Sequence, residues 1–158
     1  MTDPAQTSWY ADIVLPFLLG QARRSYGEAM RHALAEAGCD DIPANGMAVI
    51  GGLAMTTGNG PLVLLGRTLG ISKQAAGQLV DTLVLRGYLK RDIDAADRRR
   101  FSLKLTERGW HAAAVQREAR ERIDAALAAR VGTGTVAAAR RALGALVEIG
   151  GEQAQDRG

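Results

Sequence analysis

Three consecutive arginines, Arg98, Arg99 and Arg100, make a dense cluster of positive charge in the chain. Two aspartates, Asp94 and Asp97, come directly before them, and a carboxylate can hold a guanidinium group in place through two parallel hydrogen bonds. Arginines that are not held in this way would project outward, where guanidinium groups contact phosphates or enter a narrow minor groove. The segment therefore predicts an anion-binding tip whose arginines are positioned by Asp94 and Asp97.

A second set of polar side chains, Gln74, Gln78 and Thr82, recurs every four residues and would form one ridge on a helix. Amides and hydroxyls suit the base edges of a major groove, where glutamine can bond adenine through two atoms. Gly77 weakens a helix by about 1 kcal/mol relative to alanine, and it would let the helix backbone approach DNA closely. The alternative is an ordinary solvated helix surface, and this helix alone does not decide between the two.

The elements that must position these residues follow from periodicity and turn residues. Apolar residues at spacings of three and four predict a long helix over residues 8–37, ended by Gly38, with Pro16 in its first turns. A second helix is expected to begin at Pro43. The composition of residues 56–60, TTGNG, predicts a loop.

A helix-turn-helix and a hairpin are expected next. A short helix over residues 62–69 and a helix that Ser72 caps, ending near Arg86, are separated by a turn that contains Gly70. Alternating apolar residues in 89–93 and 101–105 then predict two strands joined by the arginine-rich loop. The expected DNA contacts are Ser72, Lys73, Gln74, Gly77, Gln78, Thr82, Lys90, Arg91, Arg98, Arg99, Arg100 and Lys104, of which Lys90, Arg91 and Lys104 would meet phosphates.

Two further helices are expected after the hairpin. The first is capped by Thr106 and runs over about 107–130, with Trp110, Ala114, Ile123 and Leu127 on its apolar face; the second runs over about 136–150. The sequence therefore predicts a mainly α fold with a small β-hairpin.

Charge and composition favour a polyanion as partner. Residues 61–109 carry a net charge of +5, whereas residues 1–60 carry −3. Of the 158 residues, 47% are apolar, enough for a core, but no apolar run reaches the roughly 18 residues that a membrane-spanning helix needs. With no signal peptide in evidence and a single cysteine, Cys39, we expect a cytoplasmic protein without an internal disulfide.

The chain offers little chemistry for catalysis. It has two histidines and no evident Ser/His/Asp set or pair of carboxylates. His32 and Cys39 lack the spacing of zinc ligands, and no Gly-Lys-Ser/Thr follows Gly58 and Gly60, as a phosphate loop would require. We therefore expect no enzyme, no cofactor and no metal site.

Residues 65–109, LGRTLGISKQAAGQLVDTLVLRGYLKRDIDAADRRRFSLKLTERG, resemble the winged helix-turn-helix core of the MarR family of bacterial transcription regulators. The resemblance rests on LGISKQ (69–74), LVD (79–81), RGYL (86–89), the Asp-x-x-Asp-Arg-Arg wing and LTERG (105–109). It differs at Gly77 and Gln78, where the family commonly has Ser or Thr and then Arg.

The resemblance implies a homodimer that binds a near-palindromic DNA operator and usually represses. Residues 1–40 and 106–158 would form the helical dimerisation region, and residues 41–105 the DNA-binding domain. Many members release DNA when a small phenolic or lipophilic ligand binds between the two. The side chains that this arrangement could bring near such a ligand are Tyr10, Phe17, Arg24, Tyr26, Met30, Met47, Trp110 and His111.

Two alternatives stay open. Four apolar residues in a row, Leu62 to Leu65, suggest a protein-interaction module built on the same dimeric fold. Cys39 could make the protein a redox- or metal-sensing repressor, although an ordinary small buried residue is the simpler interpretation.

Overall fold

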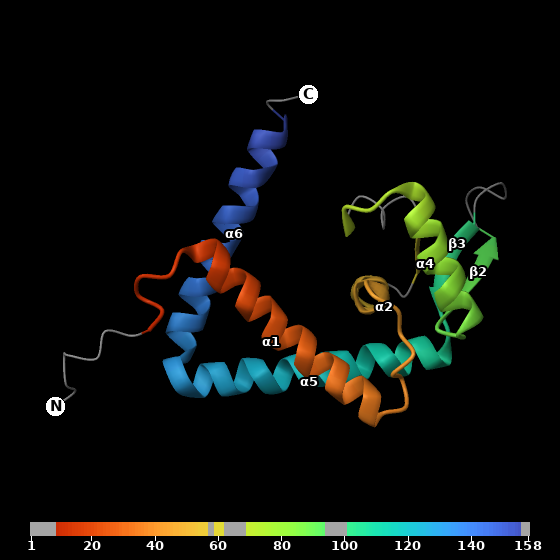
Figure 1. Cartoon of the computed structure of the whole chain (residues 1–158), viewed down its shortest axis with the longest axis horizontal. Coiled ribbons are helices and arrows are strands. Elements are labelled where there is room, and N and C mark those ends of the chain that lie inside the picture. Colours follow the sequence, from red (N-terminus) through yellow and green to blue (C-terminus); the bar gives the residue numbers. More distant parts are fainter. Residues whose placement is uncertain (1–8, 57–58, 62–68, 94–100, 156–158) are drawn as a thin grey trace. The chain divides into compact units, whose positions relative to one another are not determined.

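The computed structural model describes residues 9–56, 59–61, 69–93 and 101–155 (Figure 1). Its elements are α1 (Leu15–Glu36), α2 (Gly46–Met55), β1 (Asn59–Pro61), α4 (Lys73–Leu85), β2 (Leu89–Ile93), β3 (Phe101–Leu105), α5 (Glu107–Val131) and α6 (Thr133–Gln155). The predominance of helices beside one small sheet confirms the predicted fold class. Within the described ranges, no helix has the length and apolar character needed to cross a membrane.

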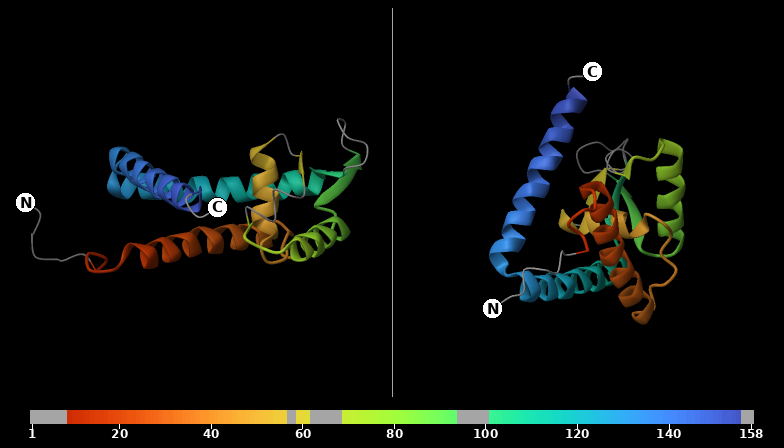
Figure 2. Two further views of the ribbon diagram at one scale, coloured as in Figure 1. Left: turned by 90° about the horizontal axis from the view of Figure 1, so that it is seen from above. Right: turned by 60° about the vertical axis from the view of Figure 1, so that its left-hand side comes forward.

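Two compact units make up the chain, and their boundary falls between Arg120 and Glu121. The first unit holds α1, α2, the sheet, α4 and the first turns of α5. Figure 1 shows α2 almost end-on, and the left view of Figure 2 shows it running across the directions of α1 and of the first turns of α5. The second unit holds the last turns of α5 and the whole of α6.

Helix α1 begins at Leu15, so the expectation of a helix from residue 8 was wrong at its start. Pro16 lies in the first turn, where a helix does not need the N–H group that proline lacks. A helix that started seven residues earlier would place Pro16 in its interior and lose a backbone hydrogen bond. The predicted stop at Gly38 is confirmed, because Gly38 follows the C-cap Ala37 with a φ of 72°.

The segment after α1 differs from the expectation in two places. Helix α2 starts at Gly46 and not at Pro43, because Asn45 adopts the left-handed conformation, with φ of 64°, and so ends any continuous helix from Pro43. Residues 59–61, part of which was expected to be loop, form strand β1, which pairs antiparallel with β3. The sheet therefore has three strands in the order β1-β3-β2.

Helix α4 and the hairpin follow the sequence prediction closely. The Ser72 hydroxyl accepts a hydrogen bond from the Ala75 N–H at 3.1 Å, so the predicted cap is present. At the other end Gly87 has a φ of 76°, and the N–H groups of Gly87 and Tyr88 donate to the carbonyls of Val84 and Leu83. This arrangement is the Schellman motif, which glycine favours at the left-handed position. It carries the chain directly into β2.

The core of the first unit lies between α2, α4, the hairpin and the start of α5. Its largest fully buried side chains are Tyr88, Ile50, Leu83, Leu89, Leu103, Val49 and Val80. The strands pair in the register Leu89↔Leu105 and Arg91↔Leu103, which places Leu89, Leu103 and Leu105 on the buried face. Figure 1 shows α4 lying along the hairpin on this side of the unit.

Helix α5 buries a different face from the one expected. Trp110 and Leu127 are exposed, whereas the buried residues are Gly109, Ala112, Ala113, Gln116 and Ala119. Small residues are needed because α5 approaches the strand backbone closely: a Cβ atom on Gly109 would stand 2.2 Å from the carbonyl oxygen of Tyr88. The predicted cap is confirmed, since the Thr106 hydroxyl accepts from the Gly109 N–H at 3.1 Å.

Helix α6 is longer than predicted at both ends, because it begins at Thr133 and continues through Gly150 to Gln155. Its apolar residues Leu143, Leu146, Val147 and Ile149 are all exposed. In the second unit Arg140 forms an ion pair with Asp124 at 3.7 Å.

Candidate nucleic-acid interface and ligand cavity

Helix α4 presents a polar face to solvent beside the hairpin. Ala76, Val80 and Leu83 are buried, while Lys73, Gln74 and Gln78 are exposed, as the sequence predicted for the two faces. Thr82 is half-buried, and its hydroxyl donates to the Gln78 carbonyl at 2.9 Å. No heavy atom lies within 4 Å of the place where a Cβ atom on Gly77 would stand. The ridge of Gln74, Gln78 and Thr82 is therefore accessible, and nothing in the described packing requires glycine at position 77.

Strands β2 and β3 carry three basic side chains, of which two form ion pairs. Arg91 forms an ion pair with Asp81, on the outer face of α4, and Lys104 forms one with Asp92 at 2.6 Å. Lys90 is exposed. Because the Arg91 and Lys104 pairs are about half exposed, a phosphate could compete with each carboxylate at small cost. The Arg91 pair also links strand β2 to α4.

The tip of the hairpin lies outside the described residues. This applies to Asp94, Asp97, Arg98, Arg99 and Arg100, and equally to the four leucine and valine residues of 62–65. Strand β2 ends at Ile93 and strand β3 begins at Phe101, which are the described residues nearest to these arginines in the sequence.

A cluster around Asp41 ties the loop after α1 to the end of α4 and the start of α5. The Tyr88 hydroxyl donates to Asp41 Oδ1 at 2.5 Å, and Arg108 Nη2 donates to the same oxygen at 3.0 Å. The Arg108 guanidinium also lies 4.3 Å from the centre of the Tyr88 ring, and Arg86 donates to the Asp41 carbonyl. Sequence reasoning missed this cluster, because its members are up to 67 residues apart.

The cluster shifts the ionisation of its two acids. The hydrogen bond from Tyr88 lowers the pKa of Asp41, and the positive charge of Arg108 acts in the same direction against the effect of burial. Burial, and then the hydrogen bond to Asp41, raise the pKa of the Tyr88 hydroxyl. Tyr88 therefore keeps its proton and stays a donor, and Asp41 stays an acceptor.

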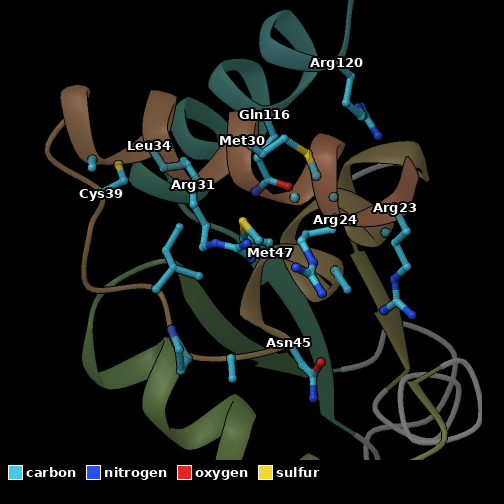
Figure 3. Close-up of a pocket in the computed structure, with 18 of the residues that line it drawn as sticks. Arg23, Arg24, Met30, Arg31, Leu34, Cys39, Asn45, Met47, Gln116 and Arg120 are labelled. Atoms are coloured by element: carbon cyan, nitrogen blue, oxygen red, sulfur yellow. The ribbon is translucent and has the colours of Figure 1, made fainter. Parts of the chain in front are cut away.

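A cavity of about 1100 Å³ opens between α1, α2 and α5 in the first unit. Its wall combines apolar side chains with arginines, as Figure 3 shows, and Arg24 and Arg31 turn from α1 toward the middle of the space. Of the eight side chains expected near a ligand, Arg24, Met30 and Met47 line this cavity; Tyr10, Phe17, Tyr26, Trp110 and His111 do not.

Several lining residues were not anticipated from the sequence. They are Arg23, Arg31 and Arg120, together with Gln116, which is 3% exposed and whose Nε2 has no hydrogen-bond partner among the described residues. Four glycines in the two helices, Gly20, Gly27, Gly51 and Gly52, also face the space. Glycines inside helices are unfavourable, and their repetition was the one signal in the sequence that could have indicated a cavity here.

Cys39 lies in the wall of the cavity and is 3% exposed. It belongs to the core cluster of the unit, which agrees with an ordinary small buried residue. His32 pairs with Glu36 at 3.3 Å on the exposed side of α1. In the described ranges, no group of three or more His, Cys, Asp or Glu residues could hold a metal ion.

A sequence model of the MarR family matches residues 64–100, which include most of the predicted helix-turn-helix and wing. A comparison with curated proteins gave no match.

Solved structures resemble the fold along most of the chain. RV1404 from Mycobacterium tuberculosis is 26% identical, with a TM-score of 0.67 over 87% of this chain and 92% of that one. The reduced form of MarR from E. coli is 20% identical, with a TM-score of 0.66 over 85% and 96%. CouR, a transcriptional repressor whose structure was solved on a 23-mer DNA duplex, is 21% identical, with a TM-score of 0.67 over 88% and 96%.

The sequence match covers the segment with the most specific motifs, and the fold match extends over the helices on both sides of it. Residues 64–100 thus match the MarR family in sequence, and the chain resembles solved structures that include MarR from E. coli and the repressor CouR along most of its length.

Proposed function

We propose that the protein is a homodimeric repressor that binds a near-palindromic DNA operator and releases it when a small ligand binds. The observation that carries the proposal is the accessible ridge of α4, with Gln74, Gln78 and Thr82, beside a two-stranded hairpin. A helix in this arrangement can enter a major groove while the hairpin follows the sugar-phosphate backbone. The DNA-bound structure of CouR, which shares the fold, supports this role.

The proposed contacts divide into two kinds. Gln74, Gln78 and Thr82 would contact base edges, and Gly77 would allow the helix backbone to come close to the groove. Ser72, Lys73, Lys90, Arg91 and Lys104 would contact phosphates, and Arg98, Arg99 and Arg100 at the wing tip would reach the minor groove with Asp94 and Asp97 positioning them.

Dimerisation is supported by apolar side chains that the single chain leaves exposed. The segment before α1 and its first turn expose Trp9, Tyr10, Ile13, Val14, Leu15 and Phe17, and α6 exposes Leu143, Leu146, Val147 and Ile149. Apolar patches of this kind commonly mark surfaces that pack against another protein. A second copy of the chain would cover them and place two α4 helices one turn of DNA apart.

In vitro selection from random duplexes tests the proposal. The native protein should enrich a near-palindromic motif. Gln74→Ala and Gln78→Ala should change the preferred bases, because a bidentate contact discriminates by about 1–3 kcal/mol. Lys73→Ala should instead weaken binding to all sequences and reduce the salt dependence by about one phosphate contact.

The matched control is Gln153→Ala, which removes an exposed glutamine from α6, away from the proposed contacts. It should leave both the motif and the affinity unchanged. If the native protein enriched no motif at all, a protein-interaction module would be the better explanation of the fold.

A further inference from the structure

The cavity between α1, α2 and α5 carries an excess of positive charge. Arg23, Arg24, Arg31 and Arg120 line it, and Asp40 is the single carboxylate among its described lining residues. In the part of the chain that the structure describes, no ion pair joins any of these arginines to an acid. Cations of one sign around a shared space raise its affinity for anions.

The first turn of α2 adds to this potential. Asn45, Met47 and Ala48 line the cavity, the first turn holds no acidic residue, and the Asn45 side chain makes no capping hydrogen bond. The N–H groups of Gly46, Ala48 and Val49 already donate to the carbonyls of Pro43 and Asn45, so α2 contributes here mainly through the roughly half positive charge at a helix amino terminus. The backbone of α2 therefore favours an anion at the same place as the arginines.

Gln116 supplies an independent sign of a missing partner. Its side chain is almost completely buried, it lines the cavity, and its Nε2 donates no hydrogen bond to any described residue. A buried donor without an acceptor costs about 1–3 kcal/mol. An acceptor oxygen on a bound ligand would remove this cost.

The glycines of the two helices keep the space open. A Cβ atom on Gly20 or on Gly52 would meet no heavy atom within 4 Å, so the packing of the unit does not require glycine at either position. At Gly27 a Cβ atom would stand 3.5 Å from Arg31 Nη1 and at Gly51 3.4 Å from Gln116 Oε1, so a methyl group would fit at both positions and would point into the lining of the cavity. Each glycine destabilises its helix by about 1 kcal/mol relative to alanine. All four glycines line the cavity.

We infer that this cavity binds a ligand with two negative charges on an apolar body. The arginines, the start of α2 and the Gln116 amide would hold the anionic groups, and Met30, Leu34, Ile42, Met47 and Met55 would contact the apolar part. This inference rests on the ligand response in the proposed function. It narrows the expectation of a small phenolic or lipophilic ligand to a dianion, such as a phosphate monoester or a dicarboxylate.

Four compounds with one apolar body test the charge requirement: naphthol, naphthoate, naphthalene dicarboxylate and naphthyl phosphate. Their affinities for the native protein are measured by isothermal titration calorimetry in a buffer without phosphate. Naphthyl phosphate or the dicarboxylate should bind at least about tenfold more tightly than naphthol, since a hydrogen bond to a charged group contributes about 1.5–3 kcal/mol. If naphthyl phosphate binds more tightly than the dicarboxylate, the cavity favours two charges on one group; if the dicarboxylate binds more tightly, it favours charges on two separate groups.

Substitutions of lining residues test whether the dianion binds in this cavity. Arg24→Gln and Arg31→Gln keep much of the side-chain size and should each weaken dianion binding about tenfold while leaving naphthol binding nearly unchanged. Gln116→Met removes the buried donor and should weaken dianion binding several-fold. The matched control is Arg122→Gln, an exposed arginine of α5 that does not line the cavity, and it should leave all four affinities unchanged.

The inference is overturned if neither dianion binds more tightly than both naphthol and the monoanion naphthoate, whether all four compounds bind equally or none binds. It is also overturned if Arg122→Gln weakens dianion binding as much as Arg24→Gln does. Operator binding by the same samples without any compound reports separately on the proposed function. If the protein binds its operator but does not prefer a dianion, the proposed function stands and only the inference about the ligand is wrong.

Discussion

At the scale of single residues, Asp41 is the most informative position outside the proposed contacts. It accepts hydrogen bonds from Tyr88 and Arg108, and these interactions lower its pKa. A carboxylate whose pKa is lower in the folded state stabilises the fold above its unfolded pKa, near 3.9, and loses that contribution as the pH falls through the folded value.

The free energy of unfolding should therefore decrease between about pH 5 and pH 2 by more in the native protein than in Asp41→Asn. At pH 7, Asp41→Asn and Tyr88→Phe should each reduce stability by about 1 kcal/mol, since the Asp41 and Arg108 side chains of the cluster are partly exposed to solvent. Urea denaturation over this pH range measures both effects. Identical pH dependence in Asp41→Asn and the native protein would show that Asp41 does not contribute through its charge.

At the scale of elements, a substitution at Gly77 should change the stability of α4 and its binding to DNA in opposite directions. Alanine at this position would meet no heavy atom within 4 Å, so Gly77→Ala should raise the free energy of unfolding by up to about 1 kcal/mol. If the backbone approaches DNA here, the added methyl group should also weaken operator binding. Denaturation and fluorescence anisotropy with the selected duplex measure the two effects.

The matched control is Gly144→Ala in α6, where an added Cβ atom likewise meets nothing within 4 Å. It should stabilise its helix similarly and leave operator affinity unchanged. Unaltered affinity in Gly77→Ala would mean that the glycine has no role in DNA binding.

The elements that local signals determine were predicted well. Ser72 and Thr106 cap their helices, and the alternation in 89–93 and 101–105 gave both strands. Features that depend on distant partners were missed. Strand β1 exists because it pairs with β3, and the buried face of α5 is chosen by the close approach at Gly109, since its alanines make several faces equally apolar.

The candidate site divides in the same way. The outward face of α4 could be predicted, because burial of Ala76, Val80 and Leu83 leaves the glutamines exposed. The cavity could not, because its arginines and Gln116 come from α1 and α5, and no pattern within either helix indicates which of their polar residues meet across a shared space.

At the scale of the whole molecule, the exposed apolar residues of α6 predict the oligomeric state. Leu146→Glu places a charge within the patch and should convert a dimer to a monomer, with loss of operator binding because a single helix would then contact half of the site. Sedimentation velocity measures the mass. Gln153→Glu adds the same charge at an exposed polar position of α6 and should leave the dimer intact. A native protein that sediments as a monomer would contradict the dimer directly.

In the segment between α1 and α2, neighbouring residues contact two different sites, the cavity and the cluster around Asp41. Cys39, Asp40, Ile42 and Pro43 line the cavity, whereas Asp41 is bonded to the residues that end α4 and begin α5. If a ligand binds in the cavity and a duplex on α4, as proposed, both would act on this one short stretch of backbone. Thermodynamic linkage then requires reciprocity: if the effector lowers the affinity for the operator by some factor, the operator lowers the affinity for the effector by the same factor. Chromosomal sites that bind this regulator most tightly should accordingly need the highest effector concentration before they are vacated.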